Sequence, residues 1–204
     1  MTDEQAVQQF EAFVQGQKPA ETPWQPVTDY SFEARRAIEG IHPQLILDHL
    51  VCCDDADILD YGCGPSAHLV RLLNEAVVTP SQVTAVGYDP QMPFSACQLL
   101  NGPYDLVICR EVLEHCTVLD LRRVVADLVR LSAKYIYVTT RFAQQPTHLL
   151  SVDSHDDLDP THITMLTRPF LRTLFVLEGC KSRYDLEEKM DWQHKGRCLV
   201  FEVA

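Results

Sequence analysis

Short apolar runs alternate along the chain with longer segments in which apolar residues recur every three or four positions. The apolar runs predict strands at residues 56–62, 83–89, 104–109 and 135–140. The longer segments predict helices at residues 66–76, 119–133 and 167–177. Strands that alternate with helices form parallel sheets with helices on both faces, joined by right-handed crossovers. The pattern therefore predicts an α/β fold.

The two ends of the chain carry patterns of their own. Two amphipathic helices are predicted before residue 51, and Gly40 and Pro43 interrupt the second one. We therefore expect an N-terminal helical cap at residues 1–50 and one structural unit at residues 51–204.

The C-terminal third combines a long polar stretch with further regular structure. Residues 143–161 are too polar for a core element, and a loop of this length is usually a lid or a binding element. Residues 183–192 and 197–203 predict a β-hairpin at the end of the chain.

Composition and charge narrow the class of protein. An apolar fraction of 46% and a length of 204 residues suit one ordinary globular domain. The net charge of −12 makes nucleic acid and anionic lipid poor electrostatic partners. No apolar run reaches membrane-spanning length, and the N-terminus lacks the pattern of a signal peptide. Eight cysteines without a C-x-x-C pair favour free thiols, so we expect a cytoplasmic protein.

A glycine-rich turn follows the first predicted strand, in the stretch Asp60-Tyr-Gly62-Cys-Gly64-Pro65. Glycines allow the backbone to turn tightly and to approach a ligand, and the helix that follows offers free amides. The spacing of Gly62, Gly64 and Ala67 also satisfies the dinucleotide fingerprint, which leaves an NAD-binding protein as an alternative. However, the Asp60 carboxylate would repel a pyrophosphate and suits a ligand that carries positive charge. A purely structural glycine turn is the third interpretation.

The D-x-G-x-G pattern of this stretch resembles the signature of the class I S-adenosylmethionine (SAM) dependent methyltransferases. The resemblance implies a Rossmann-like sheet of six or seven strands, mostly parallel, with an antiparallel C-terminal strand. It also implies that Asp60, Gly62 and Gly64 hold the amino-acid end of the cofactor, and that Asp89 at the end of the second strand binds the ribose. The remaining candidates for cofactor contact are Pro65, Pro90, Met92 (or its neighbour Gln91) and Glu111.

The chain departs from this family pattern after the second strand. Only fifteen residues separate Asp89 from Asp105, where the family usually has a helix, a strand, a helix and an acid that reads the adenine amino group. We therefore expect a shortened segment and the loss of an edge strand. Asn101 or Gln98 is our candidate to replace the missing acid, and the alternative is that backbone groups contact the adenine.

A second group of polar residues, Glu111-x-x-Glu114-His115, follows the third predicted strand, and His162 comes later in the chain. On a helical turn the first three share one side. Together, two carboxylates and two imidazoles can bind Mg²⁺ or Mn²⁺. The alternative is that they only stabilise the turn. An imidazole such as His162 can also act as a general base, so the candidate catalytic residues are His162, His115 and Glu111.

This second pattern resembles two methyltransferase groups. One is the ubiquinone-biosynthesis O-methyltransferases, and the other is the small-RNA 3′-terminal 2′-O-methyltransferases, which hold magnesium with such a quartet. The resemblance implies that Glu111, Glu114, His115 and His162 occupy metal-ligand positions.

The function predicted from the sequence is SAM-dependent methyl transfer to a small-molecule acceptor, with a hydroxyl oxygen favoured over nitrogen or carbon. A metal-dependent RNA 2′-O-methyltransferase is one alternative. It requires five basic residues to gather on one face, namely Arg122, Arg123, Arg130, Lys134 and Arg141. A non-catalytic module with the methyltransferase fold is another alternative.

Overall fold

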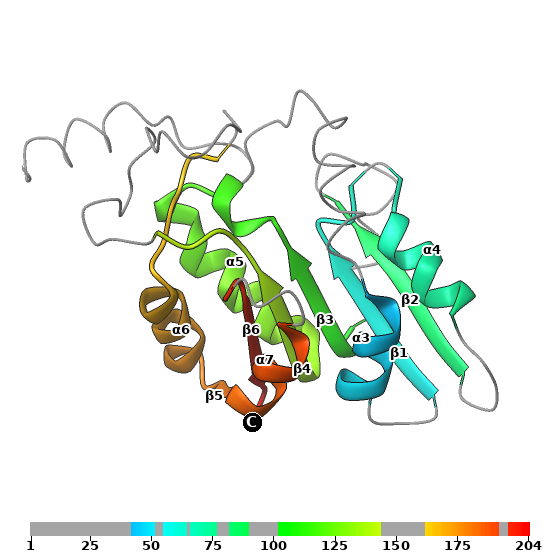
Figure 1. Ribbon diagram of the computed structural model, residues 1–204. Helices are drawn as coiled ribbons and strands as arrows, with labels where there is room; N and C mark the ends of the chain where they lie inside the picture. Colours follow the sequence, from blue (N-terminus) through cyan, green and yellow to red (C-terminus); the bar gives the residue numbers. More distant parts are fainter. Residues whose placement is uncertain are drawn as a thin grey trace, which may run out of the picture.

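The computed structural model describes residues 42–51, 55–64, 66–76, 82–89, 102–143, 162–191 and 196–204. These residues contain a six-stranded sheet in the order β2-β1-β3-β4-β6-β5 (Figure 1). The strands are β1 (Asp55–Tyr61), β2 (Gln82–Tyr88), β3 (Tyr104–Arg110), β4 (Ser132–Thr139), β5 (Lys181–Ser182) and β6 (Cys198–Glu202). The first four pair in parallel, whereas β6 is antiparallel to both β4 and β5. The predicted α/β fold with an antiparallel C-terminal strand is therefore confirmed.

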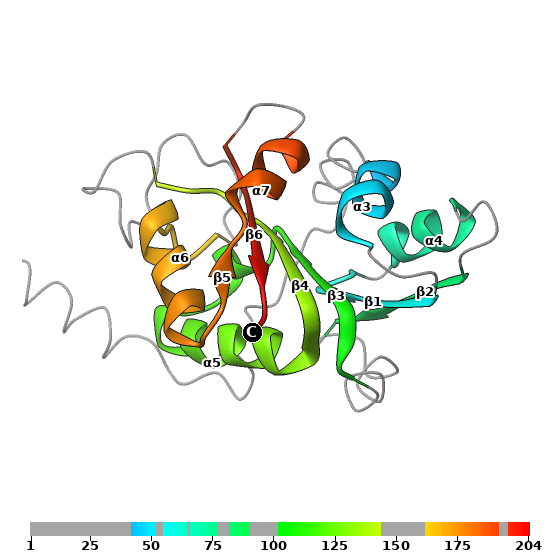
Figure 2. The same ribbon diagram turned by 90° about the horizontal axis from the view of Figure 1, so that it is seen from below.

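Helices cover both faces of the sheet, as Figure 2 shows. One face carries α3 (Pro43–Leu50), α4 (His68–Glu75) and α7 (Tyr184–Met190), and the other carries α5 (Val118–Leu131) and α6 (Arg168–Leu177). We call these the α4 face and the α5 face. No helix among the described residues is long and apolar enough to cross a membrane.

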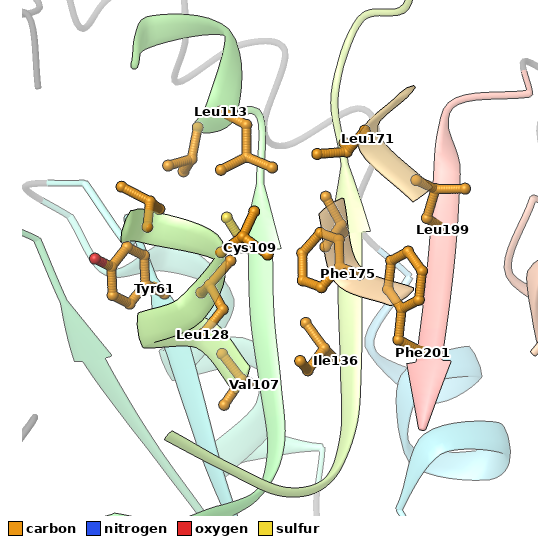
Figure 3. Packing of buried hydrophobic residues seen from close by; sticks show 14 of the residues in the cluster. Tyr61, Val107, Cys109, Leu113, Leu128, Ile136, Leu171, Phe175, Leu199 and Phe201 are labelled. Atoms are coloured by element: carbon orange, nitrogen blue, oxygen red, sulfur yellow. The ribbon is translucent and has the colours of Figure 1, made fainter. Parts of the chain in front are cut away.

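Strict alternation in the central strands divides the apolar core between the two faces. In β3, Leu106 and Ile108 pack on the α4 face, whereas Val107 and Cys109 pack on the α5 face. Both sides of the strand are buried, which explains its nearly continuous apolar sequence. On the α5 face, the rings of Phe175 and Phe201 stack with centroids 4.2 Å apart (Figure 3).

Local sequence explains where the helices begin. Thr117 and Thr167 precede α5 and α6, and each hydroxyl accepts a hydrogen bond from an amide in the first turn. Pro43, which the sequence analysis expects to interrupt the second predicted helix, is the first residue of α3. Proline fits this position because the first helical amide needs no partner within the helix.

The predicted hairpin at residues 183–192 and 197–203 is wrong in its first arm. That arm contains helix α7, and the strand before it, β5, has only two residues. Leu186 and Met190 are four residues apart and both pack on the α4 face. This spacing places both side chains on one side of a helix, which explains why the segment is helical.

A buried carboxylate compensates for the shortness of β5. Glu187 Oε1 accepts a hydrogen bond from the backbone amide of Val200 in β6 (3.3 Å). Arg168 donates to Glu187 Oε2 (2.9 Å) and to the carbonyl oxygen of Cys198 (2.9 Å). Side chains thus satisfy backbone groups of β6 that lie beyond the pairing with β5.

The helices predicted before residue 42 and the polar stretch at 144–161 lie outside the described residues. The N-terminal cap therefore stays a prediction. Within the described residues, the sheet ends at β2 on one side, next to the segment that the sequence analysis expects to be short.

Candidate functional site

The loop after β1 lies between the carboxyl ends of the first three strands. Gly62 has φ +90°, which favours glycine, and a Cβ at this residue would overlap Val112 Cγ2. The amides of Gly62 and Cys63 both donate to the carbonyl oxygen of Tyr88, at 2.7 and 3.1 Å. The loop is therefore fixed to the end of β2 on one side and packed against the segment after β3 on the other.

The second glycine of this loop has no described neighbour on its Cβ side. Gly64 has φ +64°, and a Cβ on it would meet no atom of the described residues within 4 Å. Its amide donates a hydrogen bond of 3.0 Å to Asp89 Oδ2, just beyond β2. Ala67, with φ +43°, then precedes α4 and forms no side-chain cap. Within the described part of the chain, no side chain therefore occupies the space beside Gly64.

Asp60 is the last residue but one of β1, and its side chain is buried. Burial raises the pKa of Asp60 to about 7, the Arg110 guanidinium opposes this rise, and the Asp89 carboxylate adds to it. Ionisation of this buried carboxyl is unfavourable in the ligand-free protein. A bound cation would make the ionisation favourable, because it would attract the carboxylate. Asp60 is therefore suited to a positively charged ligand group.

A second polar cluster follows β3. Glu111 has φ +52°, a strained value for a residue with a side chain, and a single 3-10 turn (Leu113–His115) comes directly after it. Glu114 is only 1% exposed, and its Oε2 accepts a hydrogen bond from Thr140 Oγ1 (2.8 Å). Its other carboxyl oxygen, Oε1, is buried and has no hydrogen-bond partner among the described residues. Burial, followed by the Glu111 charge, raises the pKa of Glu114 to about 8.

The segment that carries His162 is held against this turn. The amides of Ile163 and Thr164 donate to the carbonyl oxygen of Glu114, at 2.9 and 3.0 Å. As a result, the buried rings of His115 and His162 meet edge to face, with centroids 4.9 Å apart. Two histidines that are far apart in the sequence are thus brought together near the strand ends.

The structure does not gather these side chains around one point. Among the residues that the structure describes, no three His, Cys, Asp or Glu side chains are placed to hold a metal ion. Glu114 Oε2 accepts its hydrogen bond from Thr140 instead. A metal-binding role for Glu111, Glu114, His115 and His162 therefore stays a prediction, and we derive no step through a metal.

Several candidate residues lie outside the described residues, so their predicted contacts stay predictions. They are Pro65, Pro90, Gln91, Met92, Gln98 and Asn101.

The sequence analysis also missed polar residues that the fold brings to the site. Arg110 ends β3, Thr139 ends β4, and Thr140 follows directly after it. In β3 the alternation of apolar residues already places Arg110 on the same face as Ile108, which was the signal available. Nothing in the sequence pattern indicated that Thr140 would meet Glu114.

The chain is similar to a known sequence family and to several solved structures. Residues 32–182 match a sequence family described as a methyltransferase domain. One chain of the complex between the Haloferax volcanii Trm112 methyltransferase activator and a candidate methyltransferase has a TM-score of 0.55 and 14% identity, over 88% of this chain and 99% of that chain. No curated protein matches the chain at a significant level.

Two further solved structures share the architecture. A SAM-dependent methyltransferase from Archaeoglobus fulgidus has a TM-score of 0.51 and 15% identity, over 85% of this chain and 100% of that chain. An O-methyltransferase family protein from Burkholderia thailandensis has a TM-score of 0.50 and 11% identity, over 98% of this chain and 69% of that chain. At these identities, the likeness concerns the fold alone.

Proposed function

The chain belongs to the methyltransferase domain family, and from this premise we propose that it is a class I SAM-dependent enzyme that methylates a hydroxyl oxygen of a small molecule. One observation carries the proposal: the edge of the sheet that holds Asp60, the glycine loop and Asp89 also holds the paired rings of His115 and His162. A cofactor site and a candidate base thus lie near the ends of neighbouring strands.

The residues after β1 and β2 fit the cofactor. Asp60 can balance the ammonium of its amino-acid end, and no described residue blocks close approach of the ligand to Gly64. Asp89 is the candidate for the ribose hydroxyls, since a carboxylate oxygen can accept more than one hydrogen bond. The same buried Asp60 argues against NAD, because it would repel the pyrophosphate.

The cofactor, when bound, supplies an electrophilic methyl group on a sulfonium. A lone pair of the acceptor oxygen forms the new C–O bond as the C–S bond breaks, and the electrons of that bond remain on sulfur. The hydroxyl proton must leave, and His162 is our candidate to take it. The edge-to-face contact with His115 orients the His162 ring.

The arrangement of basic residues supports a small acceptor over RNA. On α5, Arg123 pairs with Asp120 (3.0 Å) and Arg130 with Asp127 (3.2 Å). Arg122 lies 3.6 Å from Glu178. These cations are each balanced by an acid, so they do not create a basic surface of the kind that neutralises phosphates.

Two measurements test the proposal. Calorimetry with S-adenosylhomocysteine (SAH) should give micromolar binding, on the order of −8 kcal/mol, and NAD should not bind. A panel of hydroxylated small molecules should then include an acceptor that takes up labelled methyl groups from SAM. Binding of NAD without SAH would overturn the proposal. Tight SAH binding without transfer to any hydroxyl, amine or carbon acceptor would favour a non-catalytic module.

A further inference from the structure

Three neighbouring strands carry polar side chains near their carboxyl ends, on the α4 face of the sheet. Asp60 follows Ile58 in β1, Arg110 follows Ile108 in β3, and Thr139 follows Tyr137 in β4, each by one step of the two-residue alternation. The apolar members of each pair pack together on the α4 face. The polar residues therefore share that face, one step closer to the glycine loop.

The strand register places these residues beside one another. Asp60 pairs with Ile108, so Arg110 lies one step further along the neighbouring strand on the same face. Arg110 itself pairs with Thr139. A carboxylate, a guanidinium and a hydroxyl thus form a row across the carboxyl ends of β1, β3 and β4.

Two members of this row have unused hydrogen-bonding capacity. Arg110 is half-buried, and its guanidinium forms no hydrogen bond or ion pair with any described residue. Thr139 Oγ1 is buried and likewise has no hydrogen-bond partner in the described part of the chain. Buried donors and acceptors without hydrogen-bond partners destabilise a protein unless a ligand supplies the missing partners.

Electrostatic effects on both sides locate the guanidinium within the row. Burial raises the pKa of Asp60 and of Tyr137, and in each case Arg110 is the largest influence in the opposite direction. Arg110 therefore lies close enough to interact with a residue on β1 and with one on β4.

We propose that Asp60 and Arg110 together bind the α-amino-acid group of the cofactor, with Asp60 facing the ammonium and Arg110 facing the carboxylate. This inference rests on the proposed function, because it assigns a new residue, Arg110, to the cofactor site. An α-amino acid carries its two charges on neighbouring groups of one carbon, which matches opposite charges on adjacent strands. Arginine suits the task because its planar fork can bind a carboxylate through two parallel hydrogen bonds.

The experiment removes the ligand's charges and the protein's charges separately. Calorimetry compares three thioether ligands: SAH, which has both charges, decarboxylated SAH, which keeps the amine but lacks the carboxylate, and 5′-methylthioadenosine, which lacks both. The proteins are the wild type, Arg110→Met, Arg110→Lys and Asp60→Asn. The matched control is Arg197→Met, which also removes a half-buried arginine with no ion pair among the described residues.

Arg110→Met should weaken SAH binding ten- to a hundredfold and leave the other two ligands within about threefold of the wild type. Arg110→Lys should lie between wild type and Arg110→Met for SAH, since it keeps the charge but loses the fork. Asp60→Asn should weaken the binding of SAH and of decarboxylated SAH but not that of 5′-methylthioadenosine. Arg197→Met should match the wild type throughout. Binding of 5′-methylthioadenosine also reports that each variant is folded.

Other outcomes overturn the inference. Equal weakening of all three ligands by Arg110→Met would make Arg110 a structural residue. Unchanged SAH affinity with a raised KM for the acceptor would place Arg110 in the acceptor site instead. If the wild type binds none of the three ligands, the proposed function itself fails, which is distinct from a failure confined to the Arg110 variants.

Discussion

The backbone amide of Gly64 donates a hydrogen bond of 3.0 Å to the side chain of Asp89. This bond joins the loop after β1 to the end of β2, two segments that are 25 residues apart in the sequence. Asp89 therefore has a structural task in addition to the ribose contact that we propose for it. Variants at this position must separate the two.

Asp89→Asn and Asp89→Ala separate these roles. Asparagine keeps an oxygen that accepts from Gly64, so its free energy of unfolding should stay within about 1 kcal/mol of the wild type. Alanine should lose about 1–3 kcal/mol, because the half-buried Gly64 amide loses its acceptor. Both should bind SAH at least tenfold more weakly if the carboxylate binds ribose hydroxyls. Urea unfolding and calorimetry measure the two effects, and unchanged SAH affinity in Asp89→Asn would remove the ribose assignment.

The two loop glycines should respond differently to alanine. At Gly62, an added Cβ meets Val112 and the backbone has φ +90°, so we expect a loss of about 3 kcal/mol in unfolding free energy. At Gly64 an added Cβ meets no described atom within 4 Å, and the cost should be about 1 kcal/mol from backbone strain alone. Gly64→Ala should nevertheless weaken SAH binding, because its methyl group would project into the ligand's space. Thermal unfolding in parallel with calorimetry tests this, and equal stability of the two variants would contradict it.

Much of the fold could be predicted because the pattern of apolar residues is local. The first three predicted strands agree with the structure to within one residue at each end, since each is bounded by turn residues. Strand β4 begins at Ser132, three residues before the predicted start. Its first residues are polar or small, and they join the sheet because Ser132 pairs with Tyr104, a partner that hydropathy cannot reveal.

The pH dependence of cofactor binding should follow the ionisation of Asp60. Its pKa in the folded chain is about 7, raised by burial, whereas an unfolded aspartate titrates near 3.9. A bound ammonium requires the ionised form, so SAH affinity should rise with pH by up to tenfold per unit below 7 and then level off. Calorimetry between pH 5.5 and 7.5 measures this.

The same ionisation should destabilise the ligand-free protein. The folded state binds more protons than the unfolded state between about pH 4 and 7, so the free energy of unfolding falls as the pH rises through that window. Asp60→Asn removes this contribution and should flatten both profiles. A variant whose SAH affinity keeps the wild-type pH slope would show that another group is titrating.

The polar site was only partly predictable, because its contacts depend on tertiary structure. The loop glycines and Asp60 follow from a contiguous motif. The contact between His115 and His162 requires the chain to return to the turn after β3, where two amides bind the carbonyl oxygen of Glu114. Thr140 could not be assigned for the same reason, since its role depends on facing the buried Glu114 carboxyl.

Glu114 should tolerate glutamine better than alanine. Because burial and the Glu111 charge raise the pKa of Glu114 to about 8, the carboxyl is largely neutral at pH 7. Glutamine is neutral, of similar shape, and can still accept from Thr140, so stability at pH 7 should change by less than about 1 kcal/mol. Alanine leaves the Thr140 hydroxyl without its acceptor and should cost about 1–3 kcal/mol. Urea unfolding compares the two.

Activity of the same variants tests the metal hypothesis again. A metal ligand should not tolerate glutamine, whereas a neutral structural carboxyl should, so we expect Glu114→Gln to retain most of the wild-type kcat. Treatment of the wild type with a chelator should leave kcat unchanged. Loss of activity in both experiments, with recovery on addition of magnesium, would restore the metal site that the described geometry does not support.

His162 should matter for turnover and not for cofactor affinity. If it takes the hydroxyl proton, His162→Gln should lower kcat by about a hundredfold or more, in line with the usual contribution of a general base. SAH affinity should stay within about threefold of the wild type, because Asp60, the glycine loop and Asp89 hold the cofactor. His115→Gln should lower kcat less, since its ring only orients His162. The control is His49→Gln, which changes a half-buried histidine in the last turn of α3.

The pH profile separates a base from a structural ring. With His162 as base, wild-type kcat should fall as the pH is lowered, and His162→Gln should lose that limb of the profile. Single-turnover methyl transfer across pH 5.5–8.5 measures it. If the variant keeps the limb and loses SAH affinity in parallel with kcat, His162 supports the turn after β3 and another group must receive the proton.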